Sequence, residues 1–180
     1  MSVTKNNNES IVKLLIENGA DINKASNNFY SFENGVNRYR VCNNFCSPLM
    51  CACSEGYEDI VKILIENGAD VNKGNKNGDT PLIKSSENGY ENIVKFLIEN
   101  GADVNKEDFE GYTPLITAIK NNNESIVKLF VENGADVNKS SKNGDTPLII
   151  ATRNNNESIV KLLVENGADL NKEITLVVYL

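Results

Sequence analysis

The sequence predicts an all-α repeat protein, a solenoid of helix-turn-helix units joined by β-hairpin fingers. The prediction rests on two motifs that recur with one period. The first motif, Gly-Ala-Asp, begins at Gly19, Gly68, Gly101, Gly134 and Gly167. The second motif, Thr/Ser-Pro-Leu, begins at Ser47, Thr80, Thr113 and Thr146. From Gly68 and from Ser47 onward the spacing is 33 residues, and two independent motifs do not share a period by chance.

Residues 75–107 show how one unit is expected to fold. Asn77-Gly78 supplies the positive φ of a tight turn at the tip of the finger. Thr80 is a good helix N-cap, and Pro81 suits the first helical position because its missing N–H has no partner there anyway. Gly89 can adopt the left-handed conformation that ends this first helix. The finger and the first helix are therefore predicted from local residue chemistry.

The second helix of the unit and the helix ends keep the same period. This helix is expected to end at Asn100-Gly101, and its apolar residues are Ile93, Val94, Phe96, Leu97 and Ile98. In two later units Asn122 and Asn155 stand where Gly89 stands in this one. Asn is the non-glycine residue that best tolerates the left-handed region, so we expect the turn to be kept.

A unit of 33 residues with a hairpin turn, Thr-Pro-Leu, two antiparallel helices and Gly-Ala-Asp closely resembles the ankyrin repeat. The resemblance covers nearly the whole chain and implies an ankyrin-type α-solenoid. One position departs from the family, which usually has a hydrogen-bonding His after Thr-Pro-Leu. The residues at that position here are Met50, Ile83, Ile116 and Ile149. We therefore expect apolar contact in place of the polar bridge.

The period divides the chain into seven segments. We predict a partial N-terminal unit, an inserted extended hairpin finger, four full units and an apolar tail, at residues 1–24, 25–41, 42–74, 75–107, 108–140, 141–173 and 174–180. A solenoid needs polar caps, and neither end of this array has one. The array is thus expected to be part of a longer one, a truncated gene product, or half of an end-to-end pair. The tail is expected to pack on the last helices, with a strand or aggregation as alternatives.

The inserted finger lengthens the chain between Gly19 and Gly68 to 49 residues, one period plus 16. Two strand-like runs, 29–32 and 36–41, flank Asn34-Gly35 and predict a β-hairpin. Aromatic residues and arginine dominate binding hot spots, and the candidates here are Phe29, Tyr30, Arg38 and Tyr39. The alternative is that these side chains pack the finger onto neighbouring repeats.

Composition and charge argue against several classes of function. The net charge of −7 disfavours nucleic-acid phosphates and anionic membranes as partners. The absence of histidine removes the commonest general base and metal ligand. Acidic residues such as Glu58 and Glu91 recur with the period, four residues before Lys62 and Lys95, so they indicate a surface ladder rather than a catalytic pair. We predict no catalytic residue, no cofactor and no enzyme activity.

The cysteines and the N-terminus bear on metal binding and on location. Neither zinc-site pairs nor a disulfide framework fits the spacing of Cys42, Cys46, Cys51 and Cys53, so we expect reduced thiols and no metal site. The N-terminal residues lack the pattern of a signal peptide, and no apolar run is long enough to span a membrane. We predict an intracellular protein, cytoplasmic or alternatively nuclear.

Partner-binding residues are expected where the units differ, because packing determines the shared positions. The resemblance implies binding through hairpin tips and the concave face of the first helices. The candidates on the fingers are Lys76, Asp79, Phe109, Glu110, Tyr112, Lys142 and Asp145. Those at the ends of first helices are Glu87, Lys120 and Arg153. Phe109 and Tyr112 are the expected anchor, and the alternative is that Phe109 packs on a neighbouring finger.

The resemblance implies a protein–protein interaction module that acts as an adaptor, scaffold or inhibitor. The expected partner is another protein, and the uncapped ends also suggest end-to-end self-association. The alternative function is a non-catalytic fragment of a larger ankyrin-containing protein whose effector or catalytic domain lies outside this chain.

Overall fold

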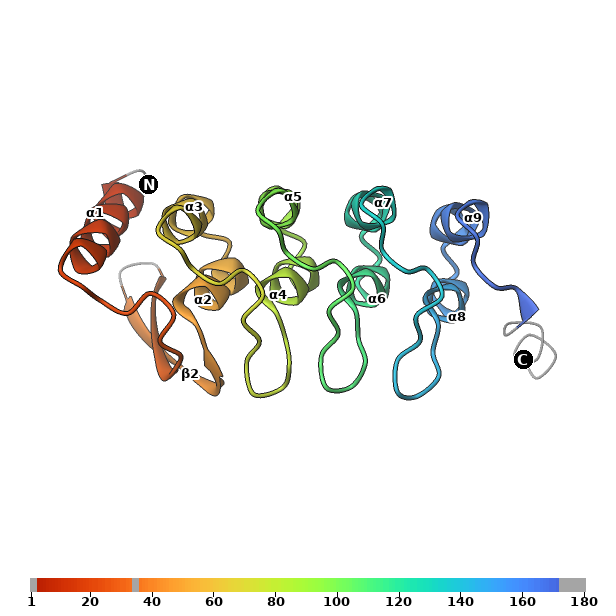
Figure 1. Cartoon of the computed structure of the whole chain (residues 1–180), viewed down its shortest axis with the longest axis horizontal. Coiled ribbons are helices and arrows are strands. Elements are labelled where there is room, and N and C mark those ends of the chain that lie inside the picture. Colours follow the sequence, from red (N-terminus) through yellow and green to blue (C-terminus); the bar gives the residue numbers. More distant parts are fainter. Residues whose placement is uncertain (1–2, 34–35, 172–180) are drawn as a thin grey trace.

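The computed structural model describes residues 3–33 and 36–171, with side chains described for residues 9–25 and 45–171. Within these ranges the chain forms a row of helix pairs, with all second helices on one side and all fingers on the other (Figure 1). The elements are α1 (Val3–Glu17), β1 (Ser26–Glu33), β2 (Val36–Cys46), α2 (Pro48–Glu55), α3 (Glu58–Glu66), α4 (Pro81–Glu87), α5 (Glu91–Glu99), α6 (Pro114–Lys120), α7 (Glu124–Glu132), α8 (Pro147–Arg153) and α9 (Glu157–Glu165). The predicted all-α repeat solenoid is confirmed.

The first helices, α2, α4, α6 and α8, begin and end as the local chemistry predicts. Each begins with a hydroxyl N-cap that accepts a hydrogen bond from the N–H three residues on, such as Thr80 from Ile83 at 3.1 Å, and with proline in its first turn. Left-handed residues follow the helices, with φ of +75° at Gly89, +56° at Asn122 and +54° at Asn155. The prediction that asparagine keeps the glycine turn is confirmed.

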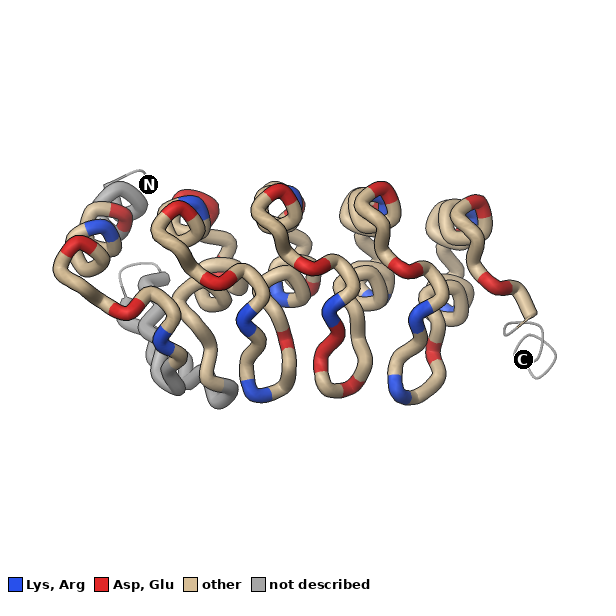
Figure 2. The backbone as a smooth tube through the Cα atoms, in the orientation of Figure 1, with Lys and Arg blue, Asp and Glu red and all other residues tan. Residues whose placement is uncertain are grey.

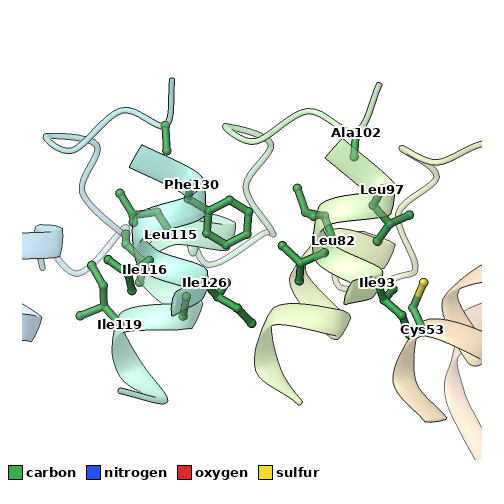
Figure 3. Close-up of a cluster of buried hydrophobic side chains, with 14 of the residues drawn as sticks. Cys53, Leu82, Ile93, Leu97, Ala102, Leu115, Ile116, Ile119, Ile126 and Phe130 are labelled. Carbon is green, nitrogen blue, oxygen red and sulfur yellow. The ribbon is translucent and has the colours of Figure 1, made fainter. Parts of the chain in front are cut away.

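One apolar core runs along the array. Its fully buried side chains include Leu82, Leu97, Leu115 and Phe130, and the Phe130 ring points from its own unit toward the neighbouring one that carries Leu82 (Figure 3). Burying a side chain of this size contributes about 1.5–3 kcal/mol. Because the core crosses every junction, each unit depends on its neighbours for stability.

The position where ankyrin repeats usually have histidine is apolar and buried throughout. Met50, Ile83, Ile116 and Ile149 are all at most 5% exposed. These four side chains carry no polar group that needs a partner, so apolar burial replaces the polar bridge as expected.

Repeated hydrogen bonds in the loops after the second helices join the units. Asn105 donates from Nδ2 to the Gly134 carbonyl at 3.1 Å and accepts at Oδ1 from the Asp136 N–H at 2.8 Å. The Lys139 ammonium donates to the Asn105 carbonyl at 3.0 Å. Asn23 and Asn72 make the same three bonds and Asn138 makes the first two, and we call these groups the loop ladder. Acidic and basic positions recur accordingly along successive loops (Figure 2).

The regular fingers are turns rather than strand pairs. In the finger at 75–79 the Asn75 N–H donates to Asp79 and the Gly78 N–H donates back to Asn75, both at 3.0 Å. Five residues leave no room for a longer ladder, and β1 and β2 are the strands found in the described part of the chain. The β-hairpin expected for every finger is thus seen there only in the insertion.

The inserted hairpin is longer than the sequence predicts. Its antiparallel register runs from Glu33 opposite Val36 to Ser26 opposite Cys46, with an irregularity between Ser26 and Asn28. Strand β2 therefore continues past the expected boundary at 41 into the finger of the first full unit. The predicted turn at Asn34-Gly35 lies outside the described residues.

The N-terminal unit has one long helix, α1, that packs on α3. At the other end the predicted tail, residues 174–180, lies outside the described residues. None of the described helices combines the length and apolar character that crossing a membrane requires.

Candidate protein-binding surface

The fingers at 75–79, 108–112 and 141–145 and the helices α4, α6 and α8 form what we call the finger surface (Figure 1). Backbone hydrogen bonds link neighbouring fingers, from the Phe109 N–H to the Asn77 carbonyl at 2.8 Å and from the Lys142 N–H to the Glu110 carbonyl at 3.0 Å. Side chains are not involved in these bonds, so the residues at the tips can vary while the fingers keep their places.

Glycine allows this close approach. Gly111 has a φ of +80°, and a Cβ built on it lies 2.8 Å from the Lys142 nitrogen. A Cβ on Gly78 lies equally close to the Phe109 nitrogen. Real Cβ contacts are not this short, so both glycines are required by the spacing of the fingers as well as by their φ.

The residue that opens each finger differs, and so does its bonding. Asn75 accepts from two N–H groups of its own finger, at 2.9 and 3.0 Å, and donates to Asp79 at 2.9 Å. Asp108 accepts from the N–H groups of Glu110 and Tyr112 at 2.9 and 2.8 Å. The buried Oγ of Ser141 makes no hydrogen bond. The opening side chain of the third finger therefore contributes no hydrogen bond to it.

A groove of about 240 Å³ lies between α4 and α6, where the fingers meet the helices. It is an open hollow on the finger surface, and the side chains that line it are both charged and apolar. They are Asp79, Ile83, Lys84, Glu87, Asp108, Tyr112, Thr117, Lys120 and Asn121. The predicted residues Asp79, Glu87, Tyr112 and Lys120 thus share one site.

The two lysines of the groove differ in whether a carboxylate lies beside the ammonium group. The Lys84 ammonium lies 2.9 Å from a Glu87 oxygen and 3.2 Å from an Asp79 oxygen. Burial lowers the pKa of Lys84, but hydrogen bonds to the two carboxylates and their negative charges outweigh it, and the pKa lies above its ordinary value. The Lys120 ammonium lies 3.9 Å from the centre of the Tyr112 ring and makes no ion pair with a described residue. Of the two groove lysines, Lys120 is therefore the one without a carboxylate partner among the described residues.

Phe109 is both exposed and in contact with a neighbouring finger, so it has features of the two alternatives from the sequence, a binding anchor and a packing residue. Its side chain is 62% exposed, which favours an anchor, while one edge of the ring lies against Gly78 of the neighbouring finger. The half-buried Tyr112 lies three residues on, in the wall of the groove. The neighbouring finger thus holds the Phe109 ring in place and leaves most of it open to solvent.

The other candidates on the fingers differ in their burial and in their bonding partners. Asp79 is 6% exposed and bonded within its own finger, so its contribution to the surface is internal. Asp145 pairs with Arg153, and both belong to the unit after the groove. Glu110 and Lys142 are exposed.

The candidates in the insertion can be placed by backbone only. Tyr30 lies opposite Tyr39, Phe29 opposite Arg40, and Arg38 opposite Ser31. Their side chains lie outside the description, so their roles stay predictions.

Sequence reasoning missed Phe45. This residue has a φ of +53° and occupies the finger position at which the later units have Gly78, Gly111 and Gly144. Its ring lies beneath the Lys76 ammonium, 3.7 Å from ring centre to nitrogen. The predicted contact residue Lys76 is therefore held by the preceding finger. Aligning the four fingers would have singled out Phe45 as a bulky residue in a left-handed position.

The described residues contain no group of three or more cysteines and carboxylates placed to hold a metal ion. Cys46, Cys51 and Cys53 form no disulfide, and the latter two are buried in α2. Desolvation by burial raises the pKa of the Cys53 thiol, which keeps it protonated and poorly reactive.

Fold and surface together define a repeat solenoid that presents a preformed row of fingers. A sequence model described as ankyrin repeats (3 copies) matches residues 1–108 and 105–174. The chain belongs to the ankyrin repeat family. A comparison with curated proteins found no match. Ankyrin repeats are generally protein–protein interaction modules, and their fold is typically non-catalytic.

Proposed function

We propose that this protein binds another protein through the finger surface, with the groove between α4 and α6 at the centre of the contact. The observation that carries the proposal is the exposure of Phe109 at the tip beside that groove. Among the described residues, the other large exposed hydrophobic side chains lie at the two ends of the array: Ile11, Leu14, Leu15, Val164 and Leu170. An exposed aromatic side chain on a rigid tip away from the ends supports an interface role.

The chemistry of the site suggests what the partner presents. Covering a phenylalanine side chain contributes about 1.5–3 kcal/mol, so an apolar group is expected against Phe109. Lys120 has no carboxylate partner among the described residues, whereas Lys84 has two. We therefore expect an acidic group of the partner near Lys120 and the Tyr112 ring. Because the fingers are preformed, binding costs little ordering entropy.

The proposed role is non-catalytic: the protein holds or blocks its partner as an adaptor, scaffold or inhibitor. In the alternative, the same surface recruits the partner for an effector or catalytic domain of a larger protein. We propose a cytoplasmic or nuclear location, which suits a chain whose Cys46, Cys51 and Cys53 form no disulfide. Cell fractionation tests the location.

The proposal is tested by protein capture followed by a measured affinity. The immobilised chain is incubated with lysate of the source cell, and captured proteins are identified by mass spectrometry. Calorimetry then gives the Kd of the purified partner for the wild type and for Phe109→Ala, Lys120→Ala and Leu170→Ala. We expect Phe109→Ala to weaken binding at least roughly tenfold and Lys120→Ala less, since a desolvated aromatic anchor outweighs a rim charge.

Leu170→Ala is the matched control, because Leu170 is an exposed apolar side chain outside the finger surface. It should leave the Kd unchanged, and all three variants should keep the melting temperature of the wild type. An unchanged Kd for Phe109→Ala, or an equal loss for Leu170→Ala, contradicts the assignment of the surface.

The inserted hairpin is tested separately by deleting residues 25–40. If the hairpin contributes to the contact, the deletion weakens partner binding while the array still unfolds cooperatively. Loss of cooperative unfolding, followed by circular dichroism, supports the alternative that the hairpin packs on the neighbouring repeats.

A further inference from the structure

The two ends of the array carry complementary halves of the junction that joins the units. At the described internal junctions the asparagine of one loop bonds to the next Gly-Ala-Asp loop, and at those of Asn23, Asn72 and Asn105 a lysine of the next loop bonds back. For Asn72 these contacts are 3.0 Å to the Gly101 carbonyl, 2.8 Å to the Asp103 N–H and 2.8 Å from the Lys106 ammonium to the Asn72 carbonyl. The same geometry recurs along the array, so it defines what a free end can accept.

The loop after α1 carries the receiving half of this junction, and no described residue occupies it. Gly19, Asp21 and Lys24 stand where Gly101, Asp103 and Lys106 stand in the internal junction. The Gly19 carbonyl, the Asp21 N–H and the Lys24 ammonium take part in no hydrogen bond with another described residue. The loop has the same internal geometry as the others, with the Asn23 N–H bonded to Asp21 at 2.9 Å, so these groups are already placed for a junction.

The C-terminal end carries the other half. Asn171 is the counterpart of Asn72, and its loop shows the same turn, with the Asn171 N–H bonded to Asp169 at 2.9 Å. Among the described residues its side-chain amide bonds only to that same Asp169, at 3.1 Å. The asparagine that would join a following unit is thus present but turned back on its own loop.

Apolar side chains at the two ends match in the same way. In the internal hollow between α3 and α5, Val61 lies with Ile93 and Phe96 of the next unit. Their counterparts at the N-terminal end are Ile11 and Leu14, which are 49% and 58% exposed, whereas Ile93 is 1% exposed. The N-terminal end therefore exposes the face that internal units bury on the preceding helix.

The C-terminal end exposes the opposite face. A hollow of about 520 Å³ on α8 and α9 is lined in part by Val160 and Val164. Val160 is only partly buried, while its counterparts Val61, Val94 and Val127 are at most 1% exposed. This is the face that internal units bury under the following helix.

We propose that a second copy of this chain docks at each end, head to tail, with its α1 against α9 and its Gly19–Lys24 loop against Asn171. The contact would continue both the core and the loop ladder across the boundary between the copies. It uses different surfaces on the two copies, so it leaves one end free on each side and forms open chains rather than closed dimers. This proposal is independent of the finger surface.

The test uses one blocked end in each of two variants. Leu14→Glu places a charge on the N-terminal face, and Val164→Glu places one on the C-terminal face. Both positions are exposed, at 58% and 39%, so each variant should fold. We expect the wild type to form assemblies whose mean mass in analytical ultracentrifugation rises with concentration beyond that of a dimer. Each variant alone should stay a monomer of about 19.8 kDa.

Mixing the variants gives the decisive result. One intact face remains on each variant, so the mixture should form a 1:1 complex that does not grow. A symmetric dimer uses the same face on both copies, so mixing the two variants would not restore it. Phe109→Glu is the control, because it charges an exposed apolar residue far from both ends, and its assembly should match the wild type. A monomeric wild type, or a mixture that stays monomeric, overturns the proposal. Association seen only after residues 172–180 are removed also overturns it, because it assigns the end face to the chain's own tail.

Discussion

The loop ladder and the finger surface both join neighbouring units, the ladder through particular side chains and the fingers through backbone groups. In the ladder Asn23, Asn72 and Asn105 make the same three contacts at successive junctions. On the finger surface the residues that open the fingers, Asn75, Asp108 and Ser141, differ in type and in bonding. The ladder contacts between units are uniform, whereas the side-chain contacts within each finger vary.

The difference shows how the scaffold separates stacking from recognition. Ladder contacts use particular side chains, so those side chains must recur. Finger-to-finger contacts use backbone groups, such as the Phe109 N–H on the Asn77 carbonyl, and these are available whatever the side chain is. The tips can therefore carry Phe109 in one unit and Lys142 in the next without disturbing the stack.

The largest expected effect comes from breaking the close approach of the fingers. Gly111→Ala combines a left-handed φ of +80° with a Cβ only 2.8 Å from the Lys142 nitrogen, whereas Gly144 has a similar φ of +83° and open space around it. We expect the unfolding free energy to fall by about 2–3 kcal/mol for Gly111→Ala and by about 1 kcal/mol for Gly144→Ala. Urea denaturation of both variants measures the difference, and equal losses would show that φ alone matters.

A smaller effect is expected from removing one rung of the ladder. Asn105→Ala removes two side-chain hydrogen bonds between units and should cost about 1 kcal/mol, because the groups are partly solvated. Asn171→Ala is the matched control, since Asn171 bonds only within its own loop among the described residues. At concentrations where the chain is monomeric it should lie within about 0.5 kcal/mol of the wild type. A loss for Asn171→Ala equal to that for Asn105→Ala would mean that the bonds between units contribute nothing extra.

The smallest effect concerns the charge cluster of the groove. The pKa of Lys84 is raised above its ordinary 10.5 in the folded protein. A raised pKa means that the stabilisation is fully present below pH 10.5 and is lost as the pH rises through the folded-state value. As the pH rises through the folded-state pKa, the wild type should lose a few tenths of a kcal/mol of unfolding free energy that Lys84→Met does not lose. The effect is small because the Lys84 ion pairs are partly solvated. Parallel urea titrations of the two proteins from neutral to alkaline pH test this, and identical curves would contradict it.

Much of the fold was predictable because its determinants are local. Thr80 and Pro81 begin a helix and Gly89 ends it through their own hydrogen bonding and φ preferences, and Asn122 and Asn155 replace the glycine because they tolerate the same conformation. The spacing of 33 residues then implies that every unit has the same partners. Part of the groove was also predictable, because Glu87, Tyr112 and Lys120 differ between otherwise matching units.

Other features were not accessible from local patterns. Asp79 reads as an exposed charge on a tip but is buried beside Asn75 and Lys84. Lys76 reads as a free contact residue but lies over the ring of Phe45. In both cases the deciding neighbour comes from the packing of the finger, which residue type and spacing do not specify.

The sequence by itself thus determined the period, the helices, their caps and the residues that vary between units, since each follows from short-range preferences repeated along the chain. The tertiary structure alone decided how far β2 extends. It also decided, among the described residues, which lysine of the groove lacks a carboxylate partner and which groups at the two ends lack partners. The physical reason is that hydrogen bonds and burial between units depend on distances across the stack, as the exposed Ile11 and its buried counterpart Ile93 show for one residue type in two surroundings.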